Sequence, residues 1–194
     1  MKRDFSNESF LNFLLRFLRS LDIRFRGYFF RNFGMFSDNK CSGLCIGIHP
    51  KFINSKGIKF GKNVALGNFP RLECYNVNLN SAKLEIGDET TFGDYLHIGT
   101  ISNIFIGKGV LGGSNILIID HNHGNSTKEE LMDSQIIPRE RLISSKGGII
   151  IEDNVWIGDD VKILGSVNIG RGSVIAANSI ITKDVAPYTV FIKK

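Results

Sequence analysis

The chain has 194 residues, of which 42% are hydrophobic, and its 24 basic and 19 acidic residues give a formal net charge of +5. A single domain of ordinary globular composition fits this length. Eight of the basic and four of the acidic residues fall within residues 1–40. The charge is therefore local, and with no nucleic-acid motif or basic–aromatic platform elsewhere, nucleic acid is excluded as the expected partner.

Cys41, Cys45 and Cys74 form no C-x-x-C pair, and their odd number favours a reducing, cytosolic compartment. The N-terminal apolar run is interrupted by Arg16 and Arg19, and no small-residue cleavage site follows it. We therefore expect neither a signal peptide nor a membrane-spanning helix.

Residues 1–40 predict an amphipathic helical and aromatic arm. A helix is expected over residues 6–21, capped by Ser6 or Asn7. Its apolar side and the aromatic run that follows comprise Phe10, Leu14, Phe17, Leu18, Leu21, Phe25, Tyr28, Phe29, Phe30, Phe33, Met35 and Phe36. Two interpretations are open. The arm packs on its own β-domain or on a neighbouring subunit, or residues 1–36 contact a membrane surface with the interleaved arginines on anionic lipid.

Residues 41–119 predict short strands joined by turns, because apolar residues recur at every sixth position, a period that suits neither a helix nor a long strand. The recurrence falls into three runs: Ile46, Phe52 and Ile58; Phe60, Leu66 and Leu72; Ile86, Phe92, Ile98 and Ile104. Slips between the runs predict bulged or longer corners, with the pattern broken around residues 70–83.

Residues 120–149 interrupt the repeat with a polar stretch. A long irregular segment inside a compact domain is more often functional than accidental. We therefore expect a loop excursion here.

The six-residue period is most regular over residues 151–181. An isoleucine stands at every sixth position: Ile151, Ile157, Ile163, Ile169, Ile175 and Ile181. Self-similarity at this short period indicates a parallel β-helix, in which each coil is buried by its neighbours.

The stretch IEDNVWIGDDVKILGSVNIGRGSVIAANSIITKDV (151–185), with DYLHIG (94–99) and DHNHG (120–124), resembles the hexapeptide-repeat acyltransferases, and most closely the bacterial sugar and polysaccharide O-acetyltransferases. The resemblance implies an all-β solenoid over residues 41–194. It would be a left-handed parallel β-helix, with the excursion at about 120–149, assembled as a homotrimer.

The resemblance also implies an activity. Acetyl-CoA would be the cosubstrate, with no metal ion. The acceptor would be a sugar hydroxyl, free or on a glycolipid, in surface-polysaccharide, lipopolysaccharide or O-antigen assembly. Such an enzyme is expected in the cytoplasm, or peripherally on the inner face of the membrane.

A sugar hydroxyl needs a base to take its proton, and histidine is suited to that role near neutral pH. The chain has only His49, His97, His121 and His123. By resemblance, the catalytic base opens the excursion, so His121 is the first candidate and His123 the second. Asp120 is a candidate to orient the imidazole. Transfer would be direct, in a ternary complex without an acyl-enzyme. The alternative is that these histidines belong to a turn.

The resemblance places Asp94 and His97 near the acceptor, one or two coils from the base. The alternative for Asp94 is a turn residue that caps its own backbone.

The C-terminal coils would hold the acyl donor. By resemblance, the candidates are Trp156, Asp159, Ala177, Thr182 and Lys183. Trp156, the only tryptophan, precedes an inward isoleucine and is expected to point outward. The relatives usually continue with a Gly-x-Pro-Ala turn and a basic tail, whereas this chain continues PYTVFIKK. We therefore expect part of the contact at the nucleotide end to differ.

Three other functions remain open. The first is N-acylation of an amino-sugar nucleotide on the same scaffold. The second is a zinc β-helix enzyme that uses His97, His121 and His123 as ligands. The third is a trimeric scaffold without catalytic activity.

Overall fold

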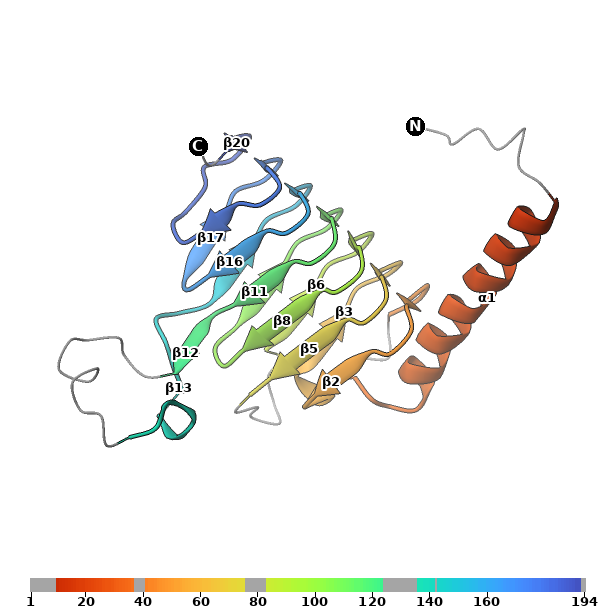
Figure 1. Ribbon diagram of the computed structural model, residues 1–194, viewed down its shortest axis with the longest axis horizontal. Helices are drawn as coiled ribbons and strands as arrows, with labels where there is room; N and C mark the ends of the chain where they lie inside the picture. The colour runs from red at the N-terminus through yellow and green to blue at the C-terminus, as the bar shows by residue number, and fades with distance from the viewer. Residues whose placement is uncertain (1–9, 37–40, 76–82, 124–135, 142, 193–194) are drawn as a thin grey trace.

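The computed structural model describes residues 10–36, 41–75, 83–123, 136–141 and 143–192. Within this part of the chain, short strands wind into a solenoid whose three sides are parallel sheets (Figure 1). With the hairpin β12–β13 set aside, each strand pairs with the third strand after it, as β1 pairs with β4 and β2 with β5. The exception is β18, which pairs with β20, because between them the sheet C strand is reduced to the isolated bridge Ile169–Val185. One coil therefore contributes one strand to each side.

We name the three sides sheets A, B and C, with strand counts that refer to the described residues. Sheet A has seven strands: β1 (Cys45–Ile46), β4 (Ala65–Leu66), β7 (Thr91–Phe92), β10 (Leu111–Gly112), β15 (Trp156–Ile157), β18 (Val174–Ile175) and β20 (Val190–Phe191). Sheet B has six: β2 (Lys51–Ile53), β5 (Arg71–Cys74), β8 (His97–Thr100), β11 (Leu117–Ile119), β16 (Lys162–Leu164) and β19 (Ile180–Ile181). Sheet C has five: β3 (Ile58–Phe60), β6 (Leu84–Ile86), β9 (Ile104–Ile106), β14 (Ile149–Ile151) and β17 (Val167–Ile169).

The recurring side chains fill the interior, as the period predicted. All six isoleucines of the 151–181 repeat are buried, and so are the residues four positions after the first five of them: Val155, Val161, Val167, Ser173 and Ser179. In the first half, Phe52 is only half-buried and packs against the core from its end. Each coil keeps the next one out of water, and at about 25 cal/mol per Å² of buried apolar area this stacking is the main stabilising contribution.

The coils differ in length, and their length locates the insertions. Trp156 pairs with Val174, 18 residues on, in the regular C-terminal coils. Arg71 pairs with His97, 26 residues on, because that coil includes the corner around residues 76–82, which lie outside the described residues. The predicted break of the repeat at residues 70–83 begins too early. Residues 71–74 form β5, because Leu72 and Cys74 point inward and keep the strand in sheet B.

The longest coil contains the segment expected to be an excursion. Leu111 pairs with Trp156, 45 residues on. After β11 the chain forms β12 (His121–His123), which pairs antiparallel with β13 (Ile143–Ser145), and the 3-10 helix η2 (Pro138–Glu140) lies between them in sequence. Residues 124–135 and 142 of the expected excursion lie outside the described residues.

Helix α1 (Phe10–Asn32) is longer than the sequence predicted. The expected end at residue 21 is wrong, since Asp22 to Asn32 contain no proline and the one glycine there, Gly27, is buried inside the helix. The expected caps, Ser6 and Asn7, lie outside the described residues. None of the helices in the described part of the chain combines the length and the apolar character that a bilayer crossing requires.

Aromatic side chains close the first coil, which has no preceding coil to cover it. The Phe36 ring lies edge-on to Phe52 and Phe60, at centroid distances of 5.2 and 4.9 Å, and Phe30 of α1 meets Phe52 at 5.6 Å. Terminal coils of a solenoid need such a cap. A second 3-10 helix, η1 (Ser55–Gly57), makes the corner between β2 and β3.

The corner between sheets A and B repeats a left-handed backbone position in every coil. Its occupants have φ between 50° and 61°: His49, Phe69, Tyr95, Asn115, Asp160 and Asn178. Asn and Asp tolerate this conformation best among residues with a β-carbon. In the first three coils aromatic rings take the position instead and stack, with Phe69 and Tyr95 centroids 5.0 Å apart.

Candidate active site

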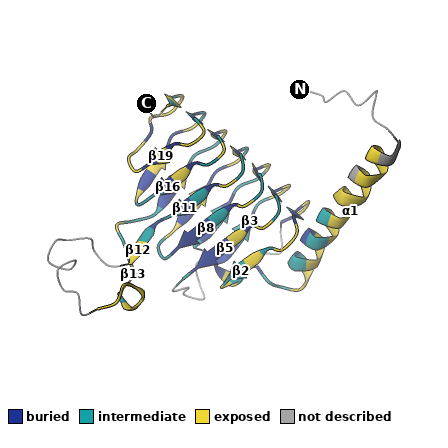
Figure 2. Cartoon of the chain, viewed as in Figure 1, coloured by how far each residue is buried: buried dark blue, intermediate teal, exposed yellow. Residues whose placement is uncertain are grey.

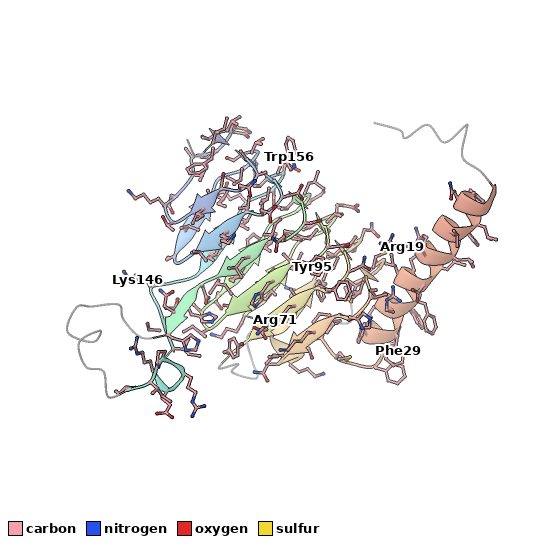
Figure 3. All side chains as sticks on the ribbon, in the orientation of Figure 1. Arg19, Phe29, Arg71, Tyr95, Lys146 and Trp156 are labelled. Carbon is pink, nitrogen blue, oxygen red and sulfur yellow. The ribbon has the colours of Figure 1, made fainter. Side chains whose placement is uncertain are left out.

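A polar cluster lies where the strands of sheet B end, at the point where the chain leaves the coil for the hairpin β12–β13. It is built from β5, β8 and the first residues after β11, which are neighbours in sheet B. Figure 3 labels Arg71 of this cluster near the middle of the solenoid and Lys146 at its left margin, beside the hairpin. Consecutive strands thus bring together side chains some 20 to 50 positions apart in sequence.

Asp120 is the buried centre of the cluster. Asp120 is 1% exposed, and its carboxylate accepts several hydrogen bonds. Oδ2 accepts from Oγ1 of Thr100 at 2.5 Å and from the N–H of Ser102 at 3.0 Å, and Oδ1 accepts from the N–H of Ile101 at 2.9 Å. These donors hold the carboxylate in one orientation from the preceding coil.

The carboxylate in turn orients the ring of His121. Nδ1 of His121 lies 3.2 Å from Oδ1 of Asp120. An ionised carboxylate can only accept, so Nδ1 carries the proton and Nε2 keeps its lone pair. No described residue hydrogen-bonds to Nε2. The imidazole is therefore set up as a proton acceptor at Nε2.

The ring of His121 is also held by packing, and its side chain is only 10% exposed. Gly99, on the preceding coil, provides the space. A β-carbon at Gly99 would lie 2.8 Å from Cδ1 of Ile119 and 3.2 Å from Cε1 of His121. The ring of Tyr75 contacts the imidazole edge-to-face, with centroids 5.6 Å apart.

A second carboxylate–imidazole pair lies beside the first. Glu73 is 2% exposed, and its Oε2 accepts from the Tyr75 hydroxyl at 3.0 Å and lies 3.2 Å from Nε2 of His97. Its Oε1 forms ion pairs with Nε of Arg71 at 2.7 Å and with Nζ of Lys51 at 3.8 Å. A buried carboxylate needs such partners.

Both carboxyl groups are ionised at neutral pH. Burial raises the pKa of Asp120, but the hydrogen bonds from His121, Thr100 and the backbone outweigh it, and the pKa lies below its ordinary value. Burial likewise raises the pKa of Glu73, and the bonds from Arg71, His97 and Tyr75 bring it below the ordinary value.

His97 is neutral at the same pH. Burial lowers the pKa of its imidazole, and the nearby Arg71 and His121 lower it further, against the raising effect of Glu73. With 30% of its side chain exposed, His97 is open to a ligand at the surface of sheet B.

The two remaining sequence candidates in this region lie apart from the cluster. His123 is exposed on β12, opposite Ile143. Asp94 lies in the turn before β8, where its Oδ1 accepts from the N–H of Asn68 at 2.7 Å and its Oδ2 from the Asn68 side-chain amide at 3.1 Å. Both oxygens of Asp94 thus cap the turn of the preceding coil, close to the turn interpretation left open by the sequence.

The residues expected to hold the acyl donor are spread over the C-terminal coils. Trp156 is 54% exposed on β15 of sheet A, which confirms its outward direction. Asp159 and Ala177 lie at the corner between sheets A and B, and Oδ1 of Asp159 accepts from the N–H of Ser114 at 2.6 Å. Thr182 and Lys183 are exposed and follow the last residue of β19, so they lie past the C-terminal ends of the sheet B strands, as His121 does. Trp156 and His121 therefore lie on different sides of one subunit.

Five residues of the cluster were not identified from the sequence: Arg71, Glu73, Tyr75, Gly99 and Thr100. One signal was present, since Glu73 is an acidic residue in a strand whose neighbours Leu72 and Cys74 are buried. The alternation of an acid between inward residues is ordinary for a solvated strand face. Only the pairing of β5 with β8 shows that this acid is buried beside an imidazole.

The zinc alternative receives no geometric support, and neither does a cysteine nucleophile. Within the described residues, no three His, Cys, Asp or Glu side chains gather as a metal site requires. Cys41 and Cys74 are buried, and burial, with the Asp120 charge, raises the pKa of Cys74 to about 12. Such a thiol is not an activated nucleophile.

Comparison with known proteins places this geometry in context. The model of the bacterial transferase hexapeptide (six repeats) family matches residues 148–183. The chain is 32% identical over 142 residues to WbbJ of Escherichia coli (strain K12), a protein named for O-acetyl transfer in lipopolysaccharide biosynthesis; the match covers 73% of this chain and 70% of that protein. It is 36% identical over 84 residues to the galactoside O-acetyltransferase of Lactococcus lactis subsp. lactis (strain IL1403), covering 43% and 36% of the two chains.

A solved structure shares the fold. AntD, an N-acyltransferase from Bacillus cereus in complex with dTDP-4-amino-4,6-dideoxyglucose and Coenzyme A, superposes with a TM-score of 0.59 at 20% identity, covering 74% of this chain and 72% of that one. At this identity the likeness concerns the arrangement of the coils and not the substrate.

Proposed function

The chain belongs to the hexapeptide-repeat acyltransferases, and from that premise we propose that it transfers the acetyl group of acetyl-CoA to a sugar hydroxyl in surface-polysaccharide or O-antigen assembly. WbbJ, whose match covers 73% of the chain, is named for O-acetyl transfer in lipopolysaccharide biosynthesis, which supports a sugar acceptor. The observation that carries the proposal is the Asp120–His121 pair, which presents a basic nitrogen at the end of sheet B.

His121 is the general base in this proposal. Nε2 of His121 takes the proton of the acceptor hydroxyl while the oxygen of that hydroxyl bonds to the acetyl carbonyl carbon. Asp120 keeps Nδ1 protonated and stabilises the imidazolium that forms, as a buried carboxylate does behind a catalytic histidine. The imidazolium then returns the proton to the departing sulfur. No acyl-enzyme is needed, and no activated nucleophile lies in the described cluster.

Acetyl-CoA supplies the acetyl group as an activated thioester. The chain offers residues that fit such a ligand: an exposed indole at Trp156, a small exposed side chain at Ala177 and a mobile cation at Lys183 for phosphate. Asp159 already caps a turn, so its contribution is to the shape of the corner rather than to a free carboxylate.

We further propose that the chain is a left-handed β-helix and works as a cytoplasmic homotrimer. Trp156 lies on sheet A and His121 follows sheet B, so the two side chains lie on different sides of one subunit. A threefold assembly, with the acyl donor in the seam between neighbours, would bring sheet A of one subunit toward sheet B of the next. The described surfaces support this, because Leu111 and Trp156 are exposed side by side on sheet A.

The acceptor is proposed to lie on sheet B beside His97. His97 is half-buried and neutral, and its Nε2–H is directed at the Glu73 carboxylate, so its Nδ1 can accept one hydrogen bond from a sugar hydroxyl. Asp94 is less suited to this role, since both of its oxygens serve the Asn68 turn.

The test is acetyl transfer from labelled acetyl-CoA to three kinds of acceptor: neutral oligosaccharides, a lipid-linked sugar and an amino-sugar nucleotide. We expect O-acetylation of a sugar, a loss of about 10²- to 10⁴-fold in His121→Ala, and near-normal turnover in the matched variant His123→Ala. Loss of turnover in His123→Ala with survival in His121→Ala would reverse the assignment of the base. Transfer to the amine alone would replace the proposal with N-acylation, and transfer to no acceptor would favour a scaffold.

A further inference from the structure

Helix α1 contacts the solenoid through a narrow side of its surface. Gly27 lies so close to the first coil that a β-carbon there would clash with the carbonyl oxygen of Leu44. One turn later, the Phe30 ring meets Phe52 at 5.6 Å. Nε of Arg26 donates to the carbonyl oxygen of Ile46 at 3.0 Å. These contacts define the side of α1 that faces the protein.

The apolar side of α1 is the opposite one. Leu14, Leu18, Leu21 and Phe25 follow the spacing of one helix face, and Gly27 falls on the other. The exposed fractions along the apolar side are Leu14 37%, Phe17 51%, Leu18 51%, Leu21 49%, Phe25 66%, Tyr28 60% and Phe29 41%. A surface helix of a globular protein normally turns its apolar side to its own core. Figure 2 shows α1 exposed along most of its length, with its first turns extending beyond the solenoid. Within the described residues this side therefore does not pack on its own β-domain, and the other form of that expectation, packing on a neighbouring subunit, stays a prediction.

The helix is strongly basic around this apolar side. It contains five arginines and one aspartate, a formal charge of +4. Arg24 and Arg31 lie on one flank, where with Tyr28 and Asn63 they line a cavity of about 430 Å³ between α1 and the first coil. The Arg31 guanidinium carbon lies 5.6 Å from the centre of the Tyr28 ring. Cations thus border an aromatic and aliphatic stripe.

We propose that α1 binds an anionic membrane surface, lying in the plane of the interface with its apolar side among the acyl chains and its arginines at the lipid phosphates. An apolar side bordered by basic residues, with aromatic rings along it, is what an interfacial helix requires. The cavity lined by Arg24 and Arg31 is placed to admit a headgroup phosphate. Charge complementarity selects this occupant over a second copy of the chain, because pairing two such helices would bring two charges of +4 together.

The inference goes beyond acyl transfer and does not depend on it. It concerns the location of the chain, because α1 packs on the first coil and would keep the solenoid at the membrane surface. An acceptor attached to lipid would then be met at the surface instead of in solution.

The test is flotation of the full-length chain with vesicles of phosphatidylcholine alone and with vesicles of phosphatidylcholine and phosphatidylglycerol in equal parts. We expect binding to the anionic vesicles at least tenfold above the neutral ones, weakened by high salt. Phe25→Glu should lower this binding at least tenfold. Ile192→Glu is the matched control, since both side chains are 66% exposed and Ile192 lies at the other end of the solenoid; it should bind as the wild type does.

A second variant separates lost binding from lost folding. Arg19→Gln with Arg24→Gln should reduce the preference for anionic vesicles and leave the unfolding temperature within a few degrees of wild type. Equal binding to both kinds of vesicle, or equal loss in Ile192→Glu, would overturn the proposal. So would the absence of vesicle binding combined with a change of oligomeric state in Phe25→Glu, because that result would assign the apolar side to another copy of the chain. Acetyl transfer enters none of these measurements, so their failure is distinct from failure of the proposed activity.

Discussion

The imidazole of His121 lies against Gly99 of the preceding coil, where an added β-carbon would stand 3.2 Å from Cε1 of the ring. The position of the ring proposed as the general base thus depends on the absence of a side chain one coil away. Gly99 lies inside β8 and its backbone is extended, so its conformation does not require glycine. The absence of a side chain leaves room for the His121 ring.

Gly99→Ala should therefore lower both turnover and stability. At 3.2 Å from Cε1 the new methyl displaces the imidazole by a few tenths of an ångström, so kcat should fall by less than the roughly 100-fold that a displacement of about 1 Å costs. Crowding of a flexible Ile119 methyl costs about 1 to 3 kcal/mol. Steady-state kinetics and thermal unfolding measure the two effects. Unchanged kcat with a lowered unfolding temperature would mean that the ring has no fixed position to lose.

Asp120→Asn should leave the fold intact and lower kcat by roughly 10²- to 10⁴-fold. An amide can donate to Nδ1, which moves the proton to Nε2 and removes the base. His123→Asn, a neighbouring exposed change, is the control. A turnover close to wild type in Asp120→Asn would contradict the assigned tautomer.

The same variant should change the acid dependence of stability. The pKa of Asp120 is lower in the folded than in the unfolded chain, so its stabilising contribution is complete above about pH 3.9 and is lost as pH falls through the folded pKa. Urea unfolding at a series of acid pH values should show a shallower loss in Asp120→Asn than in the wild type. Parallel curves would mean that the carboxylate is not held as described.

His97 should produce a separate pH dependence. Its pKa is lower in the folded chain than in the unfolded chain, where it is about 6.5, so the folded state resists protonation. Its contribution to stability is complete above about pH 6.5 and is lost as pH falls toward the folded pKa. His97→Asn should remove this slope, and an NMR titration should place the midpoint of His97 below its ordinary value. A midpoint above 6.5 would show that the pair with Glu73 outweighs burial.

Trp156→Ala should raise the KM for acetyl-CoA roughly tenfold, about 1.4 kcal/mol, and leave kcat and the unfolding temperature nearly unchanged, because the indole is exposed. Phe105→Ala on sheet C, where the ring is 43% exposed, is the matched control and should leave KM unaltered. Equal changes in both variants would remove Trp156 from the donor site.

Mixed assemblies test the seam between subunits. Co-expression of His121→Ala and Trp156→Ala chains should restore activity at low acetyl-CoA, since some seams then combine an intact His121 with an intact Trp156 from the neighbour. If both residues served one ligand within a subunit, every site would keep one lesion and mixing would restore nothing.

The six-residue period of isoleucines was sufficient to predict the solenoid and its inward ladder. Each strand-and-turn unit directs one apolar side chain inward, so apolar residues recur at a fixed spacing that can be recognised without knowing the long-range contacts. The motif DHNHG marked the imidazoles and Asp120 for a similar reason, since neighbours in sequence remain neighbours in space. The end of α1 was misjudged, since residues 22–32 carry no stop signal and the helix continues past Gly27, which lies against the first coil.

What the sequence by itself determined is the set of local relations: the repeat, the inward positions, the outward indole and the acid beside the histidine. Only the tertiary structure decided which coils meet, and so placed Glu73, Tyr75 and Gly99 around two imidazoles, assigned Asp94 to a turn and directed the apolar side of α1 away from the protein. The physical reason is that coils of 18, 20, 26 and 45 residues bring partners together across unequal lengths of chain. No fixed spacing in the sequence can express such a pairing.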